Sequence, residues 1–415
     1  MPHLSIEGGR PLTGSVPIDG AKNAALPACV AALLTDERVR LRRVPRLRDV
    51  ETILSTIASL GKRIERDGDV VDLLPGGKLG DEPDETYVAQ MRASFLVLGP
   101  LVARLGRATV PLPGGCSIGA RPVDLHLDGL RAMGASIEMH DHCVHVRADG
   151  LRGAHIRLPI PSVGATEQLL TSATLATGET CIEGPAREPE VEDLIALLRK
   201  MGAEIAVEPN TIRIVGGPRL RGADHMIIPD RLEAGTYLLA GAVTRGEVEV
   251  RGVDPAPLRP LIRVLDDAGM RIAEDDDRIT LRADGRARPI QVITAPHPGY
   301  PTDLHPPLAV LLSLGAGTGR IEERVFEHRF GYVPSLCKMG SRIDVRGRTA
   351  VITGVAGLCG ASVSAPDIRA GAALVLAGLA AKGSTAIAGI EQIDRGYASI
   401  ETKLSALGGR IERQT

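Results

Sequence analysis

The stretch from Pro113 to His126 holds the most chemically suggestive residues of this 415-residue chain. Its sequence, PGGCSIGARPVDLH, places Cys116 among small residues and Arg121 five positions later. Glycines allow a backbone to approach a ligand closely, a nearby cation favours a thiolate, and arginine binds phosphate or carboxylate. The stretch therefore predicts an accessible, acid–base-active thiol beside an anion site. An inert thiol in a tight turn is the competing interpretation, because single motifs also arise by chance.

Length and composition limit what such a site can belong to. The chain exceeds the size of one ordinary core, so we expect two domains. A net charge of −2, no Trp, three Phe and five Tyr argue against a nucleic-acid binder. The N-terminus lacks a signal-peptide pattern, apolar stretches are interrupted before spanning length, and six scattered cysteines form no C-x-x-C pair. We expect a cytoplasmic protein with no membrane partner and an aliphatic core.

A repeated pattern indicates the elements that must position these residues. An apolar residue, Gly, two further residues and Ile recur six times, with intervals of 73, 68, 67, 71 and 68 residues between the glycines. The glycines are Gly61, Gly134, Gly202, Gly269, Gly340 and Gly408. Each follows a helical pattern and precedes an alternating strand, a turn and a second strand, so the unit is a helix, a glycine cap and a β-hairpin. Solenoid repeats of ~20–45 residues are shorter than this period.

Six α/β units predict three per domain, with a break near residues 228–233. These features together resemble the enolpyruvyl transferase family over nearly the whole chain. The matching stretches are Gly20–Pro27, Met91–Ser94, the cysteine loop, Ser162–Glu167, Arg187–Glu190, Pro229–Glu233, Thr294–Pro298, Pro301–Asp303, Val325–Glu327, Asp367–Ala370 and Ile393–Tyr397.

The resemblance implies an α/β fold of two globular domains, each built of three βαβαββ-type units, with the active site in the interdomain cleft. The first domain would span residues 22–228 and carry the cysteine loop. The second would span residues 229–415 and be completed by residues 1–21.

The resemblance also implies a reaction, in which the enolpyruvyl group of phosphoenolpyruvate moves to a hydroxyl and phosphate is released. It is closest to the branch that uses the 3-hydroxyl of UDP-N-acetylglucosamine, the first committed step of peptidoglycan synthesis, with the links to cell wall biogenesis, cell shape and cell division that this implies. Cys116 would be the general acid toward the methylene carbon and the target of fosfomycin, and Asp303 the base for the hydroxyl. Asp303 as a mere helix cap is the alternative.

The resemblance assigns the remaining site residues. Lys22 and Arg121 would take the phosphate of the donor, and Arg369 and Arg395 its carboxylate, with Lys22 and Arg395 counted as catalytic. Isolated arginines are usually solvated, which is the alternative for the last two. The acceptor would contact Asn23, Arg92, Pro122, Val123, Asp124, Leu125, Ser162, Val163, Gly164 and the Val325 carbonyl, and Asp367 would orient Arg369 or nearby groups.

No cofactor or metal is expected, because side-chain cations neutralise the donor. The His140–His145 tract resembles a metal site, but strand alternation should send its side chains to opposite faces. The other five cysteines are expected in the core, and the protein is expected to be a monomer.

Several positions depart from the family pattern. His305 replaces a glutamine, His328 an asparagine, Gln392 a histidine, Ala398 a glutamate, and Ile160 a lysine that some members use. None of these departures changes a predicted catalytic or donor-binding residue. They leave open which acceptor the protein uses. One alternative is therefore an enolpyruvyl transferase of secondary metabolism acting on another uridine nucleotide such as UMP. A non-catalytic nucleotide-sugar sensor is a second. A shikimate-pathway synthase is disfavoured because that branch lacks the cysteine loop, and a redox-sensing thiol protein because no resolving cysteine lies nearby.

Overall fold

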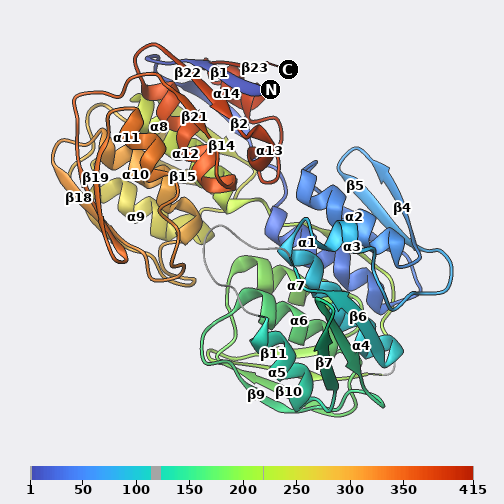
Figure 1. The fold of residues 1–415 in the computed structure, drawn as a ribbon. Coiled ribbons are helices and arrows are strands. Elements are labelled where there is room, and N and C mark those ends of the chain that lie inside the picture. Colours follow the sequence, from blue (N-terminus) through green and yellow to red (C-terminus); the bar gives the residue numbers. More distant parts are fainter. Residues whose placement is uncertain (1, 114–122, 218, 415) are drawn as a thin grey trace. The chain divides into compact units, whose positions relative to one another are not determined.

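The computed structural model describes residues 2–113, 123–217 and 219–414 (Figure 1). Cys116, Arg121 and Pro122 lie outside these residues. The described chain forms two compact units. Unit 1 contains the residues up to Asp19 together with those from Pro229 onward, and unit 2 contains those between Gly20 and Ile228. Two separate compact units are incompatible with a solenoid, because solenoid repeats stack in one continuous array.

Unit 2 contains seven α-helices among its described residues, alternating with strands. The helices are α1 (Lys22–Ala31), α2 (Arg48–Ser59), α3 (Glu85–Val88), α4 (Leu98–Leu105), α5 (Asp124–Ala132), α6 (Val163–Ala173) and α7 (Pro189–Lys200). The strands are β3 (Val39–Arg42), β4 (Lys62–Asp67), β5 (Val70–Pro75), β6 (Arg107–Pro111), β7 (Ser136–His140), β8 (Cys143–Arg147), β9 (His155–Arg157), β10 (Glu179–Glu183), β11 (Glu204–Val207), β12 (Thr211–Val215) and β13 (Ala223–Met226). They form three sheets, ordered β13-β3-β5-β4, β6-β8-β7 and β11-β12-β10-β9.

Unit 1 repeats this plan. Its helices are α8 (Arg231–Thr244), α9 (Arg259–Asp267), α10 (His305–Ser313), α11 (Val333–Lys338), α12 (Ile368–Ala380), α13 (Ile390–Ile393) and α14 (Ile400–Ala406). Its strands are β1 (His3–Glu7), β2 (Thr13–Pro17), β14 (Glu247–Arg251), β15 (Arg271–Asp275), β16 (Arg278–Arg282), β17 (Gln291–Ile293), β18 (Thr318–Glu322), β19 (Arg342–Arg346), β20 (Thr349–Thr353), β21 (Ser362–Ser364), β22 (Ser384–Ala388) and β23 (Arg410–Gln414). The sheets are β15-β16-β14-β2, β17-β18-β20-β19 and β21-β22-β1-β23.

The six predicted glycine caps are confirmed. Each of the six glycines has a positive φ, between 89° and 102°, and follows a helix. In this left-handed region a side chain would be strained, whereas glycine is not. A β-hairpin follows the first five caps. After Gly408, β23 instead pairs with β1, so His3–Glu7 take the place of the second hairpin strand.

Two kinds of helix explain the hydrophobic pattern. Helices α8 and α10 are buried at every residue, and α12 is buried from Arg369 to Leu379. The three pack against one another in the core of unit 1 (Figure 1). Outer helices such as α7 and α9 bury one face only, which gives them the helical periodicity seen in the sequence.

The core is aliphatic, as expected, but the cysteine prediction is wrong for most positions. Cys29 is buried, and burial raises the pKa of its thiol to about 12. Cys143 and Cys181 are half-buried, and Cys337 and Cys359 are exposed. No helix in the described part of the chain is long and apolar enough to cross a membrane.

Candidate active site

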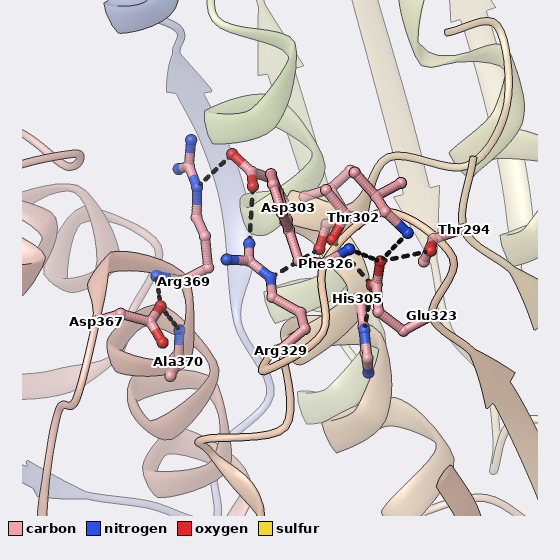
Figure 2. A network of polar contacts seen from close by, with 12 residues as sticks. Thr294, Thr302, Asp303, His305, Glu323, Phe326, Arg329, Asp367, Arg369 and Ala370 are labelled. Carbon is pink, nitrogen blue, oxygen red and sulfur yellow. Dashed lines mark hydrogen bonds and ion pairs between the residues drawn. The ribbon is translucent and has the colours of Figure 1, made fainter. Parts of the chain in front are cut away.

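Asp303 lies at the centre of a charged cluster in unit 1 (Figure 2). It belongs to a short 3₁₀ turn, Thr302–Leu304, that leads into α10, and its side chain makes no cap for that turn. One carboxylate oxygen accepts a hydrogen bond from Arg329 at 2.7 Å, and the other accepts from Nε of Arg369 at 3.0 Å. The carboxylate keeps about a quarter of its surface exposed, 24%, whereas both arginines are almost fully buried. The helix-cap interpretation of Asp303 is therefore wrong.

Arg369 is not a solvated surface residue. Its Nη1 donates to the Tyr397 hydroxyl at 3.1 Å, and its guanidinium lies 5.4 Å from the centre of the Tyr397 ring. Burial alone would lower the pKa of Arg369, but Tyr397 and Asp303 outweigh it and hold the pKa above its usual value. A permanent buried cation of this kind suits recognition of a carboxylate.

Asp367 acts on the backbone. It is the N-cap of α12 and accepts hydrogen bonds from the N–H groups of Arg369 and Ala370, at 2.9 and 3.0 Å. It therefore places Arg369 by fixing the start of its helix, while Asp303 contacts the guanidinium itself. Arg395 is half-buried and donates to Gln392 at 3.2 Å.

Unit 2 holds the second set of candidate residues. Lys22 begins α1, is 8% exposed, and has its ammonium 3.3 Å from the Asp49 carboxylate in the first turn of α2. Asn23 follows it and is half-buried, as is Arg92 at the start of a 3₁₀ turn, Arg92–Val97. A lysine this deeply buried needs a carboxylate nearby, because an isolated buried charge is very costly.

The predicted diphosphate segment forms a helix N-terminus. Ser162 is the N-cap of α6, and its hydroxyl accepts from the Ala165 N–H at 3.4 Å. Val163 and Gly164 open the helix, where backbone N–H groups and the helix dipole favour an anion. A β-carbon on Gly164 would lie 3.0 Å from the His126 ring, so a side chain here would crowd α5. In and just before α5, Val123 is buried, Leu125 half-buried and Asp124 exposed.

The departures from the family pattern differ in burial, and only His305 among them is buried. His305 is completely buried beneath the Asp303 turn. His328 and Ile160 are exposed, and Ala398 is half-buried. Of these positions, Gln392 contacts a candidate ligand-binding side chain, that of Arg395.

Sequence reasoning missed three residues of this cluster: Glu323, Arg329 and Tyr332. Glu323 lies beside the matched Val325 stretch and receives hydrogen bonds from the Val325 and Phe326 N–H groups. Arg329 lies two residues after the matched stretch Val325–Glu327. A buried acidic residue directly after a strand is the only sequence signal for Glu323, and it requires knowing where β18 ends.

No group of His, Cys, Asp and Glu within the described ranges is arranged to hold a metal ion. In the His140–His145 tract, the prediction that alternation separates the side chains is wrong for two of them. The rings of His140 and His145 stack with their centres 4.0 Å apart, because the two residues lie diagonally on paired strands β7 and β8.

Comparison with known proteins agrees with this architecture. The family model of EPSP synthase (3-phosphoshikimate 1-carboxyvinyltransferase) matches residues 6–404. The enolpyruvyl transferase NikO from Streptomyces tendae superposes with a TM-score of 0.91 at 28% identity, covering 99% of this chain and 98% of its own. EPSP synthase from Acinetobacter baumannii shares the fold, with a TM-score of 0.76 at 20% identity and full coverage of both chains.

This chain belongs to the enolpyruvyl transferase family. Among its relatives, the UDP-N-acetylglucosamine 1-carboxyvinyltransferase of Shewanella amazonensis is 47% identical over 416 residues, with 100% of both chains covered. A protein of Carboxydothermus hydrogenoformans with the name UDP-N-acetylglucosamine 1-carboxyvinyltransferase 2 is 48% identical over 417 residues, covering 100% of this chain and 99% of its own. The predicted family and fold class are confirmed.

Proposed function

We propose that this chain transfers the enolpyruvyl group of phosphoenolpyruvate to the 3-hydroxyl of UDP-N-acetylglucosamine, the first committed step of peptidoglycan synthesis. The observation that carries the proposal is full-length identity of 47–48% to relatives named for this activity. The buried arginine and the partly exposed carboxylate of unit 1 support the chemistry, since the reaction needs a carboxylate-binding cation and a proton acceptor.

The proposed reaction is an addition followed by an elimination. The acceptor oxygen bonds to C2 of phosphoenolpyruvate while Asp303 takes the hydroxyl proton and Cys116 delivers a proton to the C3 methylene. In the elimination, the resulting methyl group returns a proton to the Cys116 thiolate, the C2–O bond to phosphate breaks, and phosphate leaves with the proton held by Asp303, so that the enol double bond is restored. Lys22 and Arg121 neutralise the phosphate, and Arg369 and Arg395 hold the carboxylate.

Asn23, Arg92 and the Val325 carbonyl are proposed to hold the acceptor, with its nucleotide along Arg121, Pro122, Val123, Asp124 and Leu125. Its diphosphate is assigned to Ser162, Val163 and Gly164. The N-terminus of the 11-residue helix α6 supports this last assignment, because it presents backbone donors to an anion. By the same resemblance, we propose a cytoplasmic monomer that supports cell wall growth, cell shape and cell division and that is a target of fosfomycin.

The decisive test is phosphate release from phosphoenolpyruvate with UDP-N-acetylglucosamine, UMP or shikimate 3-phosphate as acceptor, with and without fosfomycin. We expect release with the sugar nucleotide and its abolition by fosfomycin. Release with UMP alone would instead support the secondary-metabolism alternative. No release with any acceptor would favour the nucleotide-sugar sensor.

Two substitutions at one position test the role of Cys116. Cys116→Asp retains a group that can donate a proton but no soft nucleophile, so we expect activity that fosfomycin does not inhibit. Cys116→Ser retains the size but not the acidity, and should lower kcat by about 10²-fold or more. Full activity in the serine variant would remove Cys116 from the role of general acid.

A further inference from the structure

Glu323 is a buried carboxylate that the proposed reaction does not use. It directly follows β18, and its side chain has no exposed surface. One oxygen accepts from the Thr294 hydroxyl at 2.9 Å and from the N–H groups of Val325 and Phe326, at 2.7 and 3.0 Å. The other accepts from the Thr302 hydroxyl and from Nδ1 of His305, both at 2.9 Å. Five donors converge on one side chain (Figure 2).

Two of these donors flank Asp303 in the sequence. Thr302 precedes it and His305 follows two residues later, so Glu323 holds the Asp303 turn on both sides. Arg329 adds a third link, because its Nε donates to the Thr302 carbonyl at 3.2 Å while its other end binds the Asp303 carboxylate. The turn is thereby tied to the end of β18.

His305 is held in one orientation by its neighbours. Its Nε2 lies 2.8 Å from the Tyr332 hydroxyl, and both rings are buried. Burial lowers the pKa of His305, although Glu323 opposes this, so the ring is neutral near pH 7. An ionised Glu323 can only accept, so Nδ1 carries the hydrogen and Nε2 accepts from Tyr332.

We propose that Glu323 is a positioning residue for the Asp303 carboxylate, acting through Thr302 and His305. This inference rests on the proposed function, in which Asp303 takes the acceptor proton. The same carboxylate also holds the Val325 and Phe326 backbone, so the proposed base and a proposed acceptor contact share one anchor. Displacing a reacting group by ~1 Å can cost about 10²-fold in rate, which makes a rigid anchor valuable.

Truncating Glu323 itself would orphan five buried donors and threaten folding, so the test uses its partner. Thr302→Val removes the hydroxyl but keeps the shape, and Thr302→Ser keeps the hydroxyl. Ser313→Ala is a matched control at the far end of α10, where the hydroxyl is 2.6 Å from that of Ser341. Phosphate release gives kcat and both KM values, and thermal unfolding gives Tm.

We expect Thr302→Val to lower kcat about 10- to 100-fold with both KM values changed less than about threefold, and Thr302→Ser to restore most of kcat. Ser313→Ala should lower Tm about as much while kcat stays within about threefold of the wild type. Equal kcat in the two variants at position 302, or an equal loss in Ser313→Ala, would overturn the inference alone. An inactive wild type would overturn the proposed function and, with it, the role given to Asp303.

Discussion

At the scale of single residues, the cluster around Asp303 combines one carboxylate with two buried guanidinium groups. Arg329 and Arg369 approach different oxygens, at 2.7 and 3.0 Å. Neither arginine could be buried alone, because a desolvated charge requires a partner. The carboxylate therefore stabilises the two cations that surround it, while about a quarter of its side chain, 24%, stays exposed.

Arg369→Lys tests the guanidinium geometry. Lysine keeps the charge but cannot contact Asp303 and Tyr397 at once, because it lacks the planar fork. We expect kcat/KM for phosphoenolpyruvate to fall by about 10²-fold. Arg346→Lys is the control, since that side chain is 82% exposed on a β-hairpin of the same unit. A fall of equal size in both variants would contradict a specific role for Arg369.

At the scale of elements, the candidate residues gather where inner helices begin. Lys22 opens α1, Ser162 caps α6, and Asp367 caps α12. Asp303 directly precedes α10. These four residues therefore lie at a helix N-terminus or in the turn directly before one. The N-terminal dipole adds attraction for anionic substrates.

Glu323 should make unit 1 sensitive to acid. Burial alone would raise its pKa, but hydrogen bonds from His305, Thr294 and the Phe326 N–H hold it well below the ordinary 4.5. Its stabilising contribution is therefore present above pH 4.5 and is lost as the pH falls through the lowered pKa. In urea unfolding, Glu323→Gln should reduce the free energy of unfolding at pH 7 by about 1–3 kcal/mol and by less near pH 3.

Glu65→Gln, an exposed position in unit 2, controls for the charge change and should shift the free energy of unfolding by no more than about 0.5 kcal/mol. The same loss at both pH values in Glu323→Gln would contradict the linkage to protonation.

At the scale of the whole molecule, the two units are closed by strands from distant parts of the chain. In unit 1, β1 lies between β22 and β23, and β2 pairs with β14. In unit 2, β13 pairs with β3, about 180 residues earlier in the sequence. The N-terminal residues are therefore part of the core of unit 1, where Leu4 and Ile6 are fully buried.

Leu4→Asp should consequently damage unit 1 and spare unit 2. A charge at a fully buried strand position is expected to cost about 3 kcal/mol or more. In hydrogen exchange, we expect faster exchange across β21, β22 and β23, with α1 and α6 unchanged. Ile57→Asp in α2, where Ile57 is also fully buried, is the mirror-image control for unit 2. The reverse pattern, or equal loss in both units, would contradict the division.

The sequence by itself determined the features that depend on local order. Six glycines at near-constant spacing predicted six caps, because a left-handed helix end favours glycine whatever surrounds it. Matched stretches predicted the family. The pairing of Asp303 with Arg329 and Arg369 was decided only by the tertiary structure, since the partners lie 26 and 66 residues away.

Tertiary structure also decided the exposure of Cys337 and Cys359 and the five-donor site of Glu323. Each depends on which surfaces meet after folding. Local spacing fixes backbone conformation, because the relevant contacts are a few residues apart. It does not fix the partner of a buried charge, because that partner is chosen by the packing of elements distant in the chain.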